Sequence, residues 1–396
     1  MGIYLNPAFY VAVCVLYCGL QWQPAPLSRT TWFGILNTLA LIVIFGPKAA
    51  SIVLAFTAVL WLSLHGLRSL PSGSTRLALE IAIYSVVTVA FILHKLAPAW
   101  TGAHPTTQPP ATSSQVIAAL FETIAFSYIY LRTLDSIRIV AAGGTLLNPA
   151  GLSGYLIPFF MIPAGPVNVY ADHVKIDTES PPPPAWSSFI ACADTVTSGL
   201  FLKFVVAEIW KLYFIGLSAT WPTDTFWDSA VIFIYVYFDF FGYSLVALGI
   251  GRLVGIPTPV NFNAPFLSIS VTELWTRWHI SLGDFVRRGL FIPLQVTMVR
   301  RFGRHWAYAT NLVALTLCFG FVGLWHRFTL TFIAWGFFVG LVVALEKVVR
   351  DYWIATDASK LPEMRILQRV LGPVYVFLVI VGTLHFAIPE LMGQTR

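Results

Sequence analysis

The stretch that decides the fold is residues 307–326, AYATNLVALTLCFGFVGLWH, which is apolar almost throughout and ends in Trp325-His326. A second apolar run, Phe328–Leu345, follows at once, and the two runs predict a pair of membrane-spanning helices. An ionisable imidazole in such a segment is costly, so His326 is by default a candidate functional residue. Another histidine, His279, also directly follows a tryptophan, in the stretch Glu273-Leu-Trp-Thr-Arg-Trp-His-Ile-Ser-Leu282. Although 47 positions separate the two histidines, we treat them as one candidate site.

The composition extends the membrane interpretation to the whole chain. Of the 396 residues, 57% are hydrophobic and 11% are charged, whereas soluble domains carry about 25% charged residues. The net charge is +6, but the basic residues stand between apolar runs, which indicates orientation of helices in a membrane rather than binding to nucleic acid. The four cysteines form no pattern typical of a metal site, and we predict none. The sequence therefore predicts an all-α, multi-pass membrane protein.

The N-terminal third consists of apolar runs at residues 8–21, 31–46, 48–65 and 77–94. Some are shorter than the roughly 20 residues that a spanning helix needs, so tilted, re-entrant or paired helices are expected. No Lys or Arg precedes Arg29, so we expect no cleaved signal peptide. The segment Ala97–Ser114 is rich in Pro, Thr and Ser and is typical of an aqueous loop.

Two features stand out in the next part of the chain. A helix predicted over Gln115–Ile139 places Arg132 and Asp135 three positions apart, where they can form an ion pair on one face. The segment Tyr155–Pro166 holds three prolines in an apolar context and cannot form an ordinary spanning helix. Such backbone is tolerated at membrane depth only when it is buried in protein or lines a cavity, so we predict a re-entrant loop at a substrate cavity.

Charged residues inside apolar helices remain open to two interpretations. Lys203 lies in the predicted helix Thr195–Ser218, which is either a lateral helix at the membrane interface or the carrier of a functional charge. Asp239 lies in the predicted spanning helix Asp228–Leu253 and must face the protein interior or a partner. It either shapes a substrate path or ties two helices together.

The segment around the first histidine is too polar to span a membrane. Val260–Ser270 is irregular, and Val271–Ile280 predicts a short helix in which Glu273 and Arg277 are four apart and form an ion pair. Five arginines then follow within residues 287–304, a density that marks a cytoplasmic flank. His385 in the last predicted helix, Val370–Leu391, is expected to be a packed helix residue.

Several segments of this region resemble the membrane-bound O-acyltransferase (MBOAT) family, and in particular its bacterial branch of alginate O-acetyltransferases and teichoic acid D-alanyl transfer proteins. Pro163-Ala-Gly-Pro166 is similar to a Gly-Pro loop of the family and Phe201-Leu-Lys-Phe204 to its lysine-bearing helix start. The other matching segments are Tyr237-Phe-Asp-Phe-Phe-Gly-Tyr-Ser244, Asn261-Phe-Asn-Ala-Pro-Phe266, Trp275-Thr-Arg-Trp-His-Ile-Ser-Leu282 and Gly323-Leu-Trp-His326. They occur in the family's order.

The resemblance implies a fold, a set of regions and a site. The fold would be about 11 transmembrane or re-entrant helices in a ring around a central tunnel. The regions would be N-terminal transmembrane helices (1–114), a catalytic core (115–350) and a C-terminal loop with a transmembrane helix (351–396). His326 corresponds to the near-invariant histidine of the family and His279 to its second histidine. The residues expected to bind substrate are Trp278, Trp325, Asn261, Asn263, Asp239, Arg277 and Ser281.

The chain departs from the family pattern at three places. Arg327 stands where Gly commonly follows Trp-His, Arg287-Arg288 where Arg-Asp is frequent, and Leu245 where the acetyltransferase branch has Asp. These departures leave the histidines untouched and lean away from a standard alginate enzyme.

The chemistry implied is transfer of a small acyl group to a hydroxyl. An imidazole is suited to remove the hydroxyl proton, because its ordinary pKa near 6.5 leaves a neutral form at physiological pH. We expect His326 to be the base and His279 to position or polarise the carbonyl. Indole N–H groups of Trp278 or Trp325, the Asn261 amide or backbone amides are candidate donors to the oxyanion. No Ser or Cys lies in a nucleophile motif, so no covalent acyl-enzyme is required.

The expected partners follow from that reaction. The acyl donor would be acyl-CoA or an acyl carrier protein thioester in the cytoplasm, with no bound cofactor. The acceptor would be an envelope glycan, a polyol or a membrane-anchored relay protein on the other side of the plasma membrane. The alternative is a transporter or flippase that uses buried histidines as a proton relay. Acylation of a lipid, sterol or secreted peptide is a third hypothesis. The spacing of the motifs, which is that of the bacterial branch, and the modest length of the chain argue against it.

Overall fold

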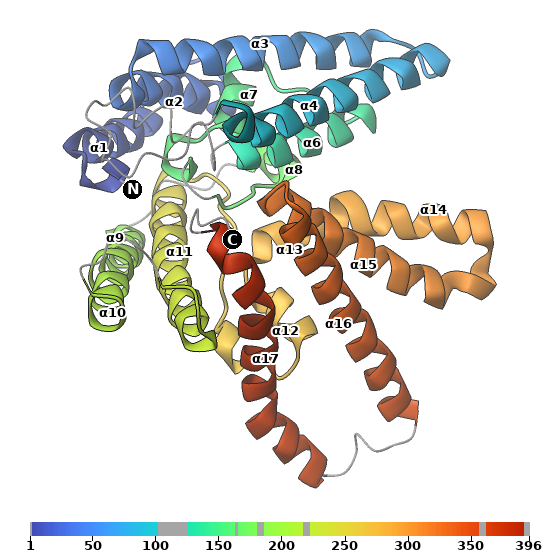
Figure 1. Ribbon diagram of the computed structural model, residues 1–396. Coiled ribbons are helices and arrows are strands. Elements are labelled where there is room, and N and C mark those ends of the chain that lie inside the picture. Colours follow the sequence, from blue (N-terminus) through green and yellow to red (C-terminus); the bar gives the residue numbers. More distant parts are fainter. Residues whose placement is uncertain are drawn as a thin grey trace. The chain divides into compact units, whose positions relative to one another are not determined.

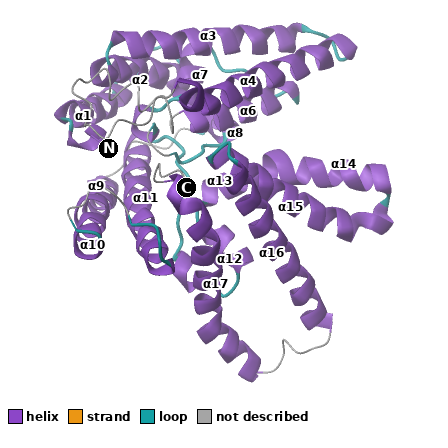
Figure 2. Ribbon diagram, in the orientation of Figure 1, coloured by secondary structure: helices purple, strands orange, loops and turns teal. Residues whose placement is uncertain are grey.

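The computed structural model describes residues 2–101, 126–162, 165–179, 186–216, 222–355 and 362–391. In these ranges the regular structure is helical (Figure 1, Figure 2), and the one β-type pairing is an isolated bridge between Phe262 and Trp278. The all-α prediction is therefore confirmed. The longer helices are α1 (Pro7–Gln21), α2 (Arg29–Phe45), α3 (Pro47–Ser69), α4 (Ser74–Thr101), α6 (Phe126–Ala141), α9 (Trp186–Phe201), α11 (Phe226–Val254), α14 (Ile292–Phe302), α15 (Ala307–His326), α16 (Leu330–Ala355) and α17 (Pro362–Leu391).

Short helical elements connect or interrupt these. They are α7 (Pro149–Leu156), α8 (Tyr170–Lys175), α10 (Ala207–Phe214), α12 (Val271–Arg277) and α13 (Ile280–Val286), the 3-10 turns η1 (Gly2–Leu5), η3 (Phe159–Met161), η5 (Pro265–Leu267) and η7 (Arg304–Trp306), and the π-helical segments η4 (Leu202–Val206) and η6 (Arg287–Phe291). The short helix predicted around Glu273 is thus confirmed as α12.

Seven helical stretches of the described residues are long and apolar enough to cross a membrane. They are Ala50–Ser69, Ser74–Leu96, Ser188–Phe214, Phe226–Val254, Arg304–His326, Leu330–Tyr352 and Ile366–Glu390. Helices α1 and α2 are apolar but shorter. The protein is a multi-pass membrane protein, while the ring, the central tunnel, the total of about 11 membrane helices and the three sequence regions remain predictions.

The contacts between residues divide the chain into two compact units. Unit 1 comprises Met1–Leu200 and Gly242–Pro259, and unit 2 comprises Phe201–Phe241 and Val260–Arg396. Helix α11 contributes its N-terminal part to unit 2 and its C-terminal part to unit 1.

In unit 1, local signals in the sequence set where helices begin. The side chain of Asn6 accepts a hydrogen bond from the backbone of Ala8, and Pro7 occupies the first helical position of α1. Asn148 and Pro149 play the same two roles for α7. These residues satisfy amide groups that a helix start leaves without intrahelical partners, and proline at the first position loses no hydrogen bond.

A buried polar network holds the proline-containing segment that follows α7. The Arg132 guanidinium, 1% exposed, donates to the carbonyl oxygens of Leu156 and Pro166, both at 2.8 Å. The predicted pairing of Arg132 with Asp135 is therefore wrong. Asp135 forms its ion pair with Arg138 at 2.6 Å, because Arg132 points toward carbonyl groups that helix periodicity does not reveal.

Residues 157–162 and 165–169 confirm that no spanning helix forms here. Most of them are buried, and Asn37 of α2 donates to the carbonyl of Ile157 and accepts from the amide of Phe159. Pro163 and Ala164 lie outside the described residues, as does most of the loop predicted over 97–114. That the segment lines a substrate cavity remains a prediction.

In unit 2, the two apolar runs around His326 form the helices α15 and α16, which pack closely through glycines. A Cβ atom added to Gly323 would lie 2.1 Å from the carbonyl oxygen of Phe332, and one added to Gly336 would lie 2.3 Å from that of Phe319. No side chain fits at either position without moving backbone. This close approach fixes the last turn of α15, which carries His326.

Candidate active site

The segment before the first histidine is shaped by a short antiparallel pairing. The amide of Asn263 donates to the carbonyl of Arg277 at 2.9 Å, and the amide of Ile280 donates to the carbonyl of Asn261 at 3.0 Å. Between these two bonds the backbone must turn from α12 into α13. His279 makes the turn in the left-handed region, with φ 48° and ψ 49°. Such backbone is uncommon for a non-glycine residue and clusters at functional sites.

His279 is held inside an aromatic pocket. Its side chain is 4% exposed, and its ring meets Phe240 edge-on at 4.9 Å and Trp325 at 6.3 Å between ring centroids. Burial, with a smaller contribution from His326, lowers the pKa of His279 to about 3. The imidazole is therefore neutral at physiological pH, with one ring N–H able to donate and one ring nitrogen able to accept.

His326 ends α15 and, unlike His279, is exposed. Its ring lies 4.9 Å from the Trp325 ring and 5.9 Å from the Trp335 ring. The Trp325 ring centroid lies 4.9 Å from that of His326 and 6.3 Å from that of His279, so the centroids of the two imidazoles lie within about 11 Å of each other. The structure thus brings together the two histidines that are 47 positions apart in the sequence.

The turn that follows His326 is fixed by the end of α17. The Glu390 carboxylate accepts hydrogen bonds from the hydroxyls of Thr329 at 2.6 Å and Thr331 at 2.7 Å. The Arg327 guanidinium donates to the backbone carbonyl of Glu390. The arginine that departs from the family's Trp-His-Gly pattern therefore has a structural partner. Sequence reasoning missed Glu390, because nothing in the pattern of α17 points to a turn about 60 residues earlier.

A second carboxylate fixes the helix before His279. Glu346 of α16 accepts from the amides of Val271 at 2.7 Å and Thr272 at 2.8 Å, and from the Thr272 hydroxyl at 2.7 Å. A carboxylate at a helix N-terminus satisfies free amide groups and complements the helix dipole. Each histidine therefore lies next to a segment that a glutamate holds in place. Glu346 holds the start of α12, before His279, and Glu390 holds the turn after His326.

Of the predicted substrate-binding residues, Trp278 joins the aromatic cluster. Its ring stacks on Phe233 at 5.0 Å, meets Phe262 edge-on at 5.0 Å and lies 5.9 Å from Tyr237. The side chain is half-buried, and Trp325 is buried. Trp325 therefore lies against both histidine rings, whereas the Trp278 ring packs into the aromatic cluster.

Asn261 and Ser281 are both 1% exposed. The Asn261 side-chain oxygen accepts from the Ser281 hydroxyl at 2.6 Å and from the Ser281 amide at 3.3 Å. This pair anchors the start of α13 directly after His279. Asn263 is exposed.

The two predicted charged residues of the site have ionic partners. Arg277 forms the predicted ion pair with Glu273, at 2.8 Å, and donates to the Asn263 carbonyl at 3.2 Å. Asp239 forms an ion pair with Lys203 of the π-helical segment η4. Asp239 directly precedes Phe240, the residue that meets His279, so the ion pair and the histidine pocket involve the same turn of α11.

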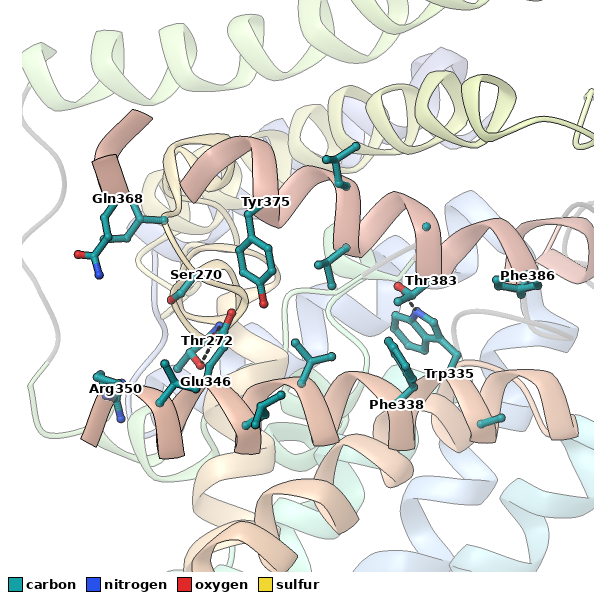
Figure 3. A pocket seen from close by; sticks show the side chains of 18 of the residues that line it. Ser270, Thr272, Trp335, Phe338, Glu346, Arg350, Gln368, Tyr375, Thr383 and Phe386 are labelled. Carbon is teal, nitrogen blue, oxygen red and sulfur yellow. Dashed lines mark hydrogen bonds between the residues drawn. The ribbon is translucent and has the colours of Figure 1, made fainter. Parts of the chain in front are cut away.

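A large cavity of about 1130 Å³ lies between α16 and α17 (Figure 3). Its walls are mostly apolar, with Glu346, Arg350, Gln368 and Tyr375 toward one end. Trp335, toward the other end, also contacts His326 and donates to the Thr383 hydroxyl at 3.3 Å. Neither histidine lines the cavity, and Trp335 is the lining residue whose ring lies near His326.

Part of the sequence matches a known protein family. Residues 197–387 match the family described as MBOAT, membrane-bound O-acyltransferase, and include both histidines. A probable alginate O-acetylase of Azotobacter vinelandii is 43% identical over 115 residues, which are 29% of this chain and 22% of the relative. A teichoic acid D-alanyltransferase of Streptococcus thermophilus is 32% identical over 167 residues, 39% of each chain.

A peptidoglycan O-acetyltransferase of Helicobacter pylori is 32% identical over 158 residues, 38% of this chain and 28% of the relative. The chain thus matches between 22% and 39% of the length of these three relatives. The matched region holds the paired histidines, the aromatic walls and the glutamate-capped helix described above. The match to the membrane-bound O-acyltransferase family thus covers residues 197–387, just under half of this chain.

Proposed function

We propose that the protein is an O-acyltransferase of the bacterial plasma membrane. It moves a small acyl group, of acetyl or D-alanyl type, from a cytoplasmic thioester to a hydroxyl of an envelope glycan, a polyol or a membrane-anchored relay protein. The observation that carries this proposal is the contact of both imidazoles with the Trp325 ring inside the family region. The relatives support the acyl and acceptor classes, since they are named for acetyl transfer to alginate and peptidoglycan and D-alanyl transfer to teichoic acid.

The two histidines suit different roles. His326 is exposed, so a substrate hydroxyl can reach it, and as the general base it removes the proton while the oxygen attacks the acyl carbonyl. His279 stays neutral because its pKa is lowered to about 3, so its ring N–H is a fixed donor to the carbonyl oxygen as negative charge develops there. Collapse of the tetrahedral intermediate then expels the thiolate of the donor, and the proton held by His326 is returned to that leaving group.

The donor is acyl-CoA or an acyl carrier protein, and the protein carries no bound cofactor. A thioester is already activated for acyl transfer, so general-base and oxyanion assistance suffice. The donor and acceptor reach the two histidines from opposite faces of the membrane through the predicted tunnel.

The test uses protein reconstituted in nanodiscs with radiolabelled acetyl and D-alanyl thioesters and a panel of envelope polymers. His326→Ala should abolish transfer, and His279→Asn should lower it by roughly 100-fold or more, the loss typical of one oxyanion donor. The matched control is His385→Ala, because that histidine packs against Ser229 at 2.9 Å within α17 and α11. Full turnover by the His326 variant would refute the proposed base.

The same protein in sealed vesicles distinguishes a transporter or flippase. Label that crosses the membrane without changing its chemical form would favour that alternative. Label that becomes ester-linked to an acceptor supports acyl transfer.

A further inference from the structure

The hairpin formed by α14 and α15 ends in a concentrated positive charge. We define the hairpin tip as Arg300–Trp306, which joins the two helices through η7 and includes Arg300, Arg301, Arg304 and His305 (Figure 1). The three arginines are exposed, and none forms an ion pair within the described part of the chain. No acidic residue occurs in the sequence between Asp284 and Glu346. Asp351, which forms a hydrogen bond with Tyr308 beside the tip, is paired with Lys347 and Arg350, so the positive charge of the tip is not neutralised by these contacts.

Away from the tip, the two helices of the hairpin expose apolar side chains. Ile292 and Val296 of α14 are each 42% exposed and four positions apart, so they lie on one helix face. Val313 and Leu317 of α15, also four apart, are 46% and 42% exposed. Arg304–His326 is long and apolar enough to cross a membrane, so exposed apolar faces of this kind suit contact with lipid chains.

This stem also suits a position of the tip at the lipid headgroups. Arg304 begins the 23-residue stretch Arg304–His326, which is long and apolar enough to cross a hydrocarbon core of roughly 30 Å, so its arginine end would lie at the headgroups. Three aromatic residues at or beside the tip are also exposed: Phe302 at 59%, Trp306 at 56% and Tyr308 at 45%. Aromatic side chains of this kind concentrate at the boundary between hydrocarbon and headgroups.

We propose that the hairpin tip binds the headgroup phosphates of anionic phospholipids. Guanidinium groups form paired hydrogen bonds with phosphate oxygens, and three of them lie within five residues here. The apolar stem and the exposed aromatic residues favour a lipid surface over an acidic protein, which would leave them uncovered. The tip thereby fixes the depth of α15, whose other end carries His326.

The test measures how strongly the full-length protein in nanodiscs prefers phosphatidylglycerol over phosphatidylcholine, by competition with a fluorescent lipid. Each basic residue near an anionic surface contributes about a five-fold preference, so the variant Arg300→Gln/Arg301→Gln/Arg304→Gln should lose up to roughly 100-fold. The matched control Lys48→Gln/Arg68→Gln/Arg252→Gln removes the same charge from exposed residues of unit 1 and should keep the preference. Both variants are first shown to match the wild-type Tm in phosphatidylcholine alone.

Raising the salt concentration should weaken the wild-type preference, because screening shortens the reach of exposed charges. An unchanged preference in the tip variant, or an equal loss in the control, would overturn the proposal. So would displacement of the lipid by inorganic phosphate at constant ionic strength, since that result assigns the tip to a soluble anion. A tip variant that keeps its lipid preference but loses binding to an acidic acyl carrier protein would assign the tip to a protein partner instead.

Discussion

The ion pair between Lys203 and Asp239 allows a structural role to be separated from a role in substrate handling. The Lys203 side chain is 7% exposed and that of Asp239 is 24% exposed, so both charges are largely removed from solvent. Lys203 reaches Asp239 from a π-helical segment, in which the wider turn redirects side chains and which frequently marks functional sites. We consider the variants Lys203→Met, Asp239→Asn and the combination of both.

The magnitudes follow from what each change leaves behind. Removing one partner of a buried pair leaves an uncompensated charge and costs about 3–5 kcal/mol. The partial exposure of Asp239 favours the lower end, about 3 kcal/mol, which lowers Tm by roughly 6–12 °C for a domain of this size. The double variant leaves no isolated charge and should be destabilised by about 1 kcal/mol or less.

The assay combines thermal unfolding, followed by tryptophan fluorescence in nanodiscs, with the rate of acyl transfer. If Asp239 only ties η4 to α11, the double variant recovers both Tm and activity. If Asp239 also shapes the substrate path, Tm recovers while activity stays low. Destabilisation of the double variant equal to the sum of the single variants would refute the argument, since it would mean that the two charges do not compensate each other.

Three further outcomes are expected. Gly323→Ala should destabilise the protein by about 1–3 kcal/mol, since the new methyl would lie 2.1 Å from the Phe332 carbonyl oxygen, whereas Gly66→Ala, with 3.9 Å of room, should be neutral in the same Tm measurement. Because the pKa of His279 is about 3 in the folded protein, only the unfolded state takes up a proton at this residue as the pH falls below about 6.5, and the free energy of unfolding decreases by about 2 kcal/mol by pH 5. The variant His279→Asn should lack this decrease, and a pH dependence of Tm identical to that of the wild type would contradict the burial argument. Glu390→Gln should lower kcat about ten-fold with KM nearly unchanged, because the turn after His326 loses the carboxylate that accepts hydrogen bonds from Thr329 and Thr331. A wild-type kcat in initial-rate measurements would show that the turn does not need this carboxylate.

Much of the fold could be predicted from local patterns. The apolar runs at 8–21, 31–46, 48–65 and 77–94 correspond to α1, α2, α3 and α4, and the hairpin around His326 corresponds to α15 and α16. The Glu273–Arg277 pair was also predictable, because four-residue spacing brings side chains together on any helix. These features depend only on interactions within one element.

The partners of charged residues in distant elements could not be predicted. Lys203 and Asp239 are 36 positions apart, and Glu346 caps a helix 75 positions earlier. Arg132 has a carboxylate at helical spacing yet donates to two carbonyl groups of a segment 24 to 34 residues away. Such pairs depend on how helices pack, which a single sequence does not encode in any short-range period.

The candidate site shows the same division. The two Trp-His motifs marked both histidines, but their contact with one indole ring depends on the turn at His279 and the glycine crossing of α15 and α16. The roles of the site residues remain predictions that the variants above test.

The left-handed backbone at His279 has a consequence for mutational scanning. Asparagine, aspartate and glycine tolerate that conformation, whereas β-branched residues resist it whatever their chemistry. A deep substitution library would therefore report strong intolerance at this position even if the imidazole took no part in a reaction. Asparagine is the replacement that removes the ring but tolerates the backbone conformation. If asparagine lowered activity as much as valine does, the loss would be due to the chemistry of the side chain rather than to the backbone conformation.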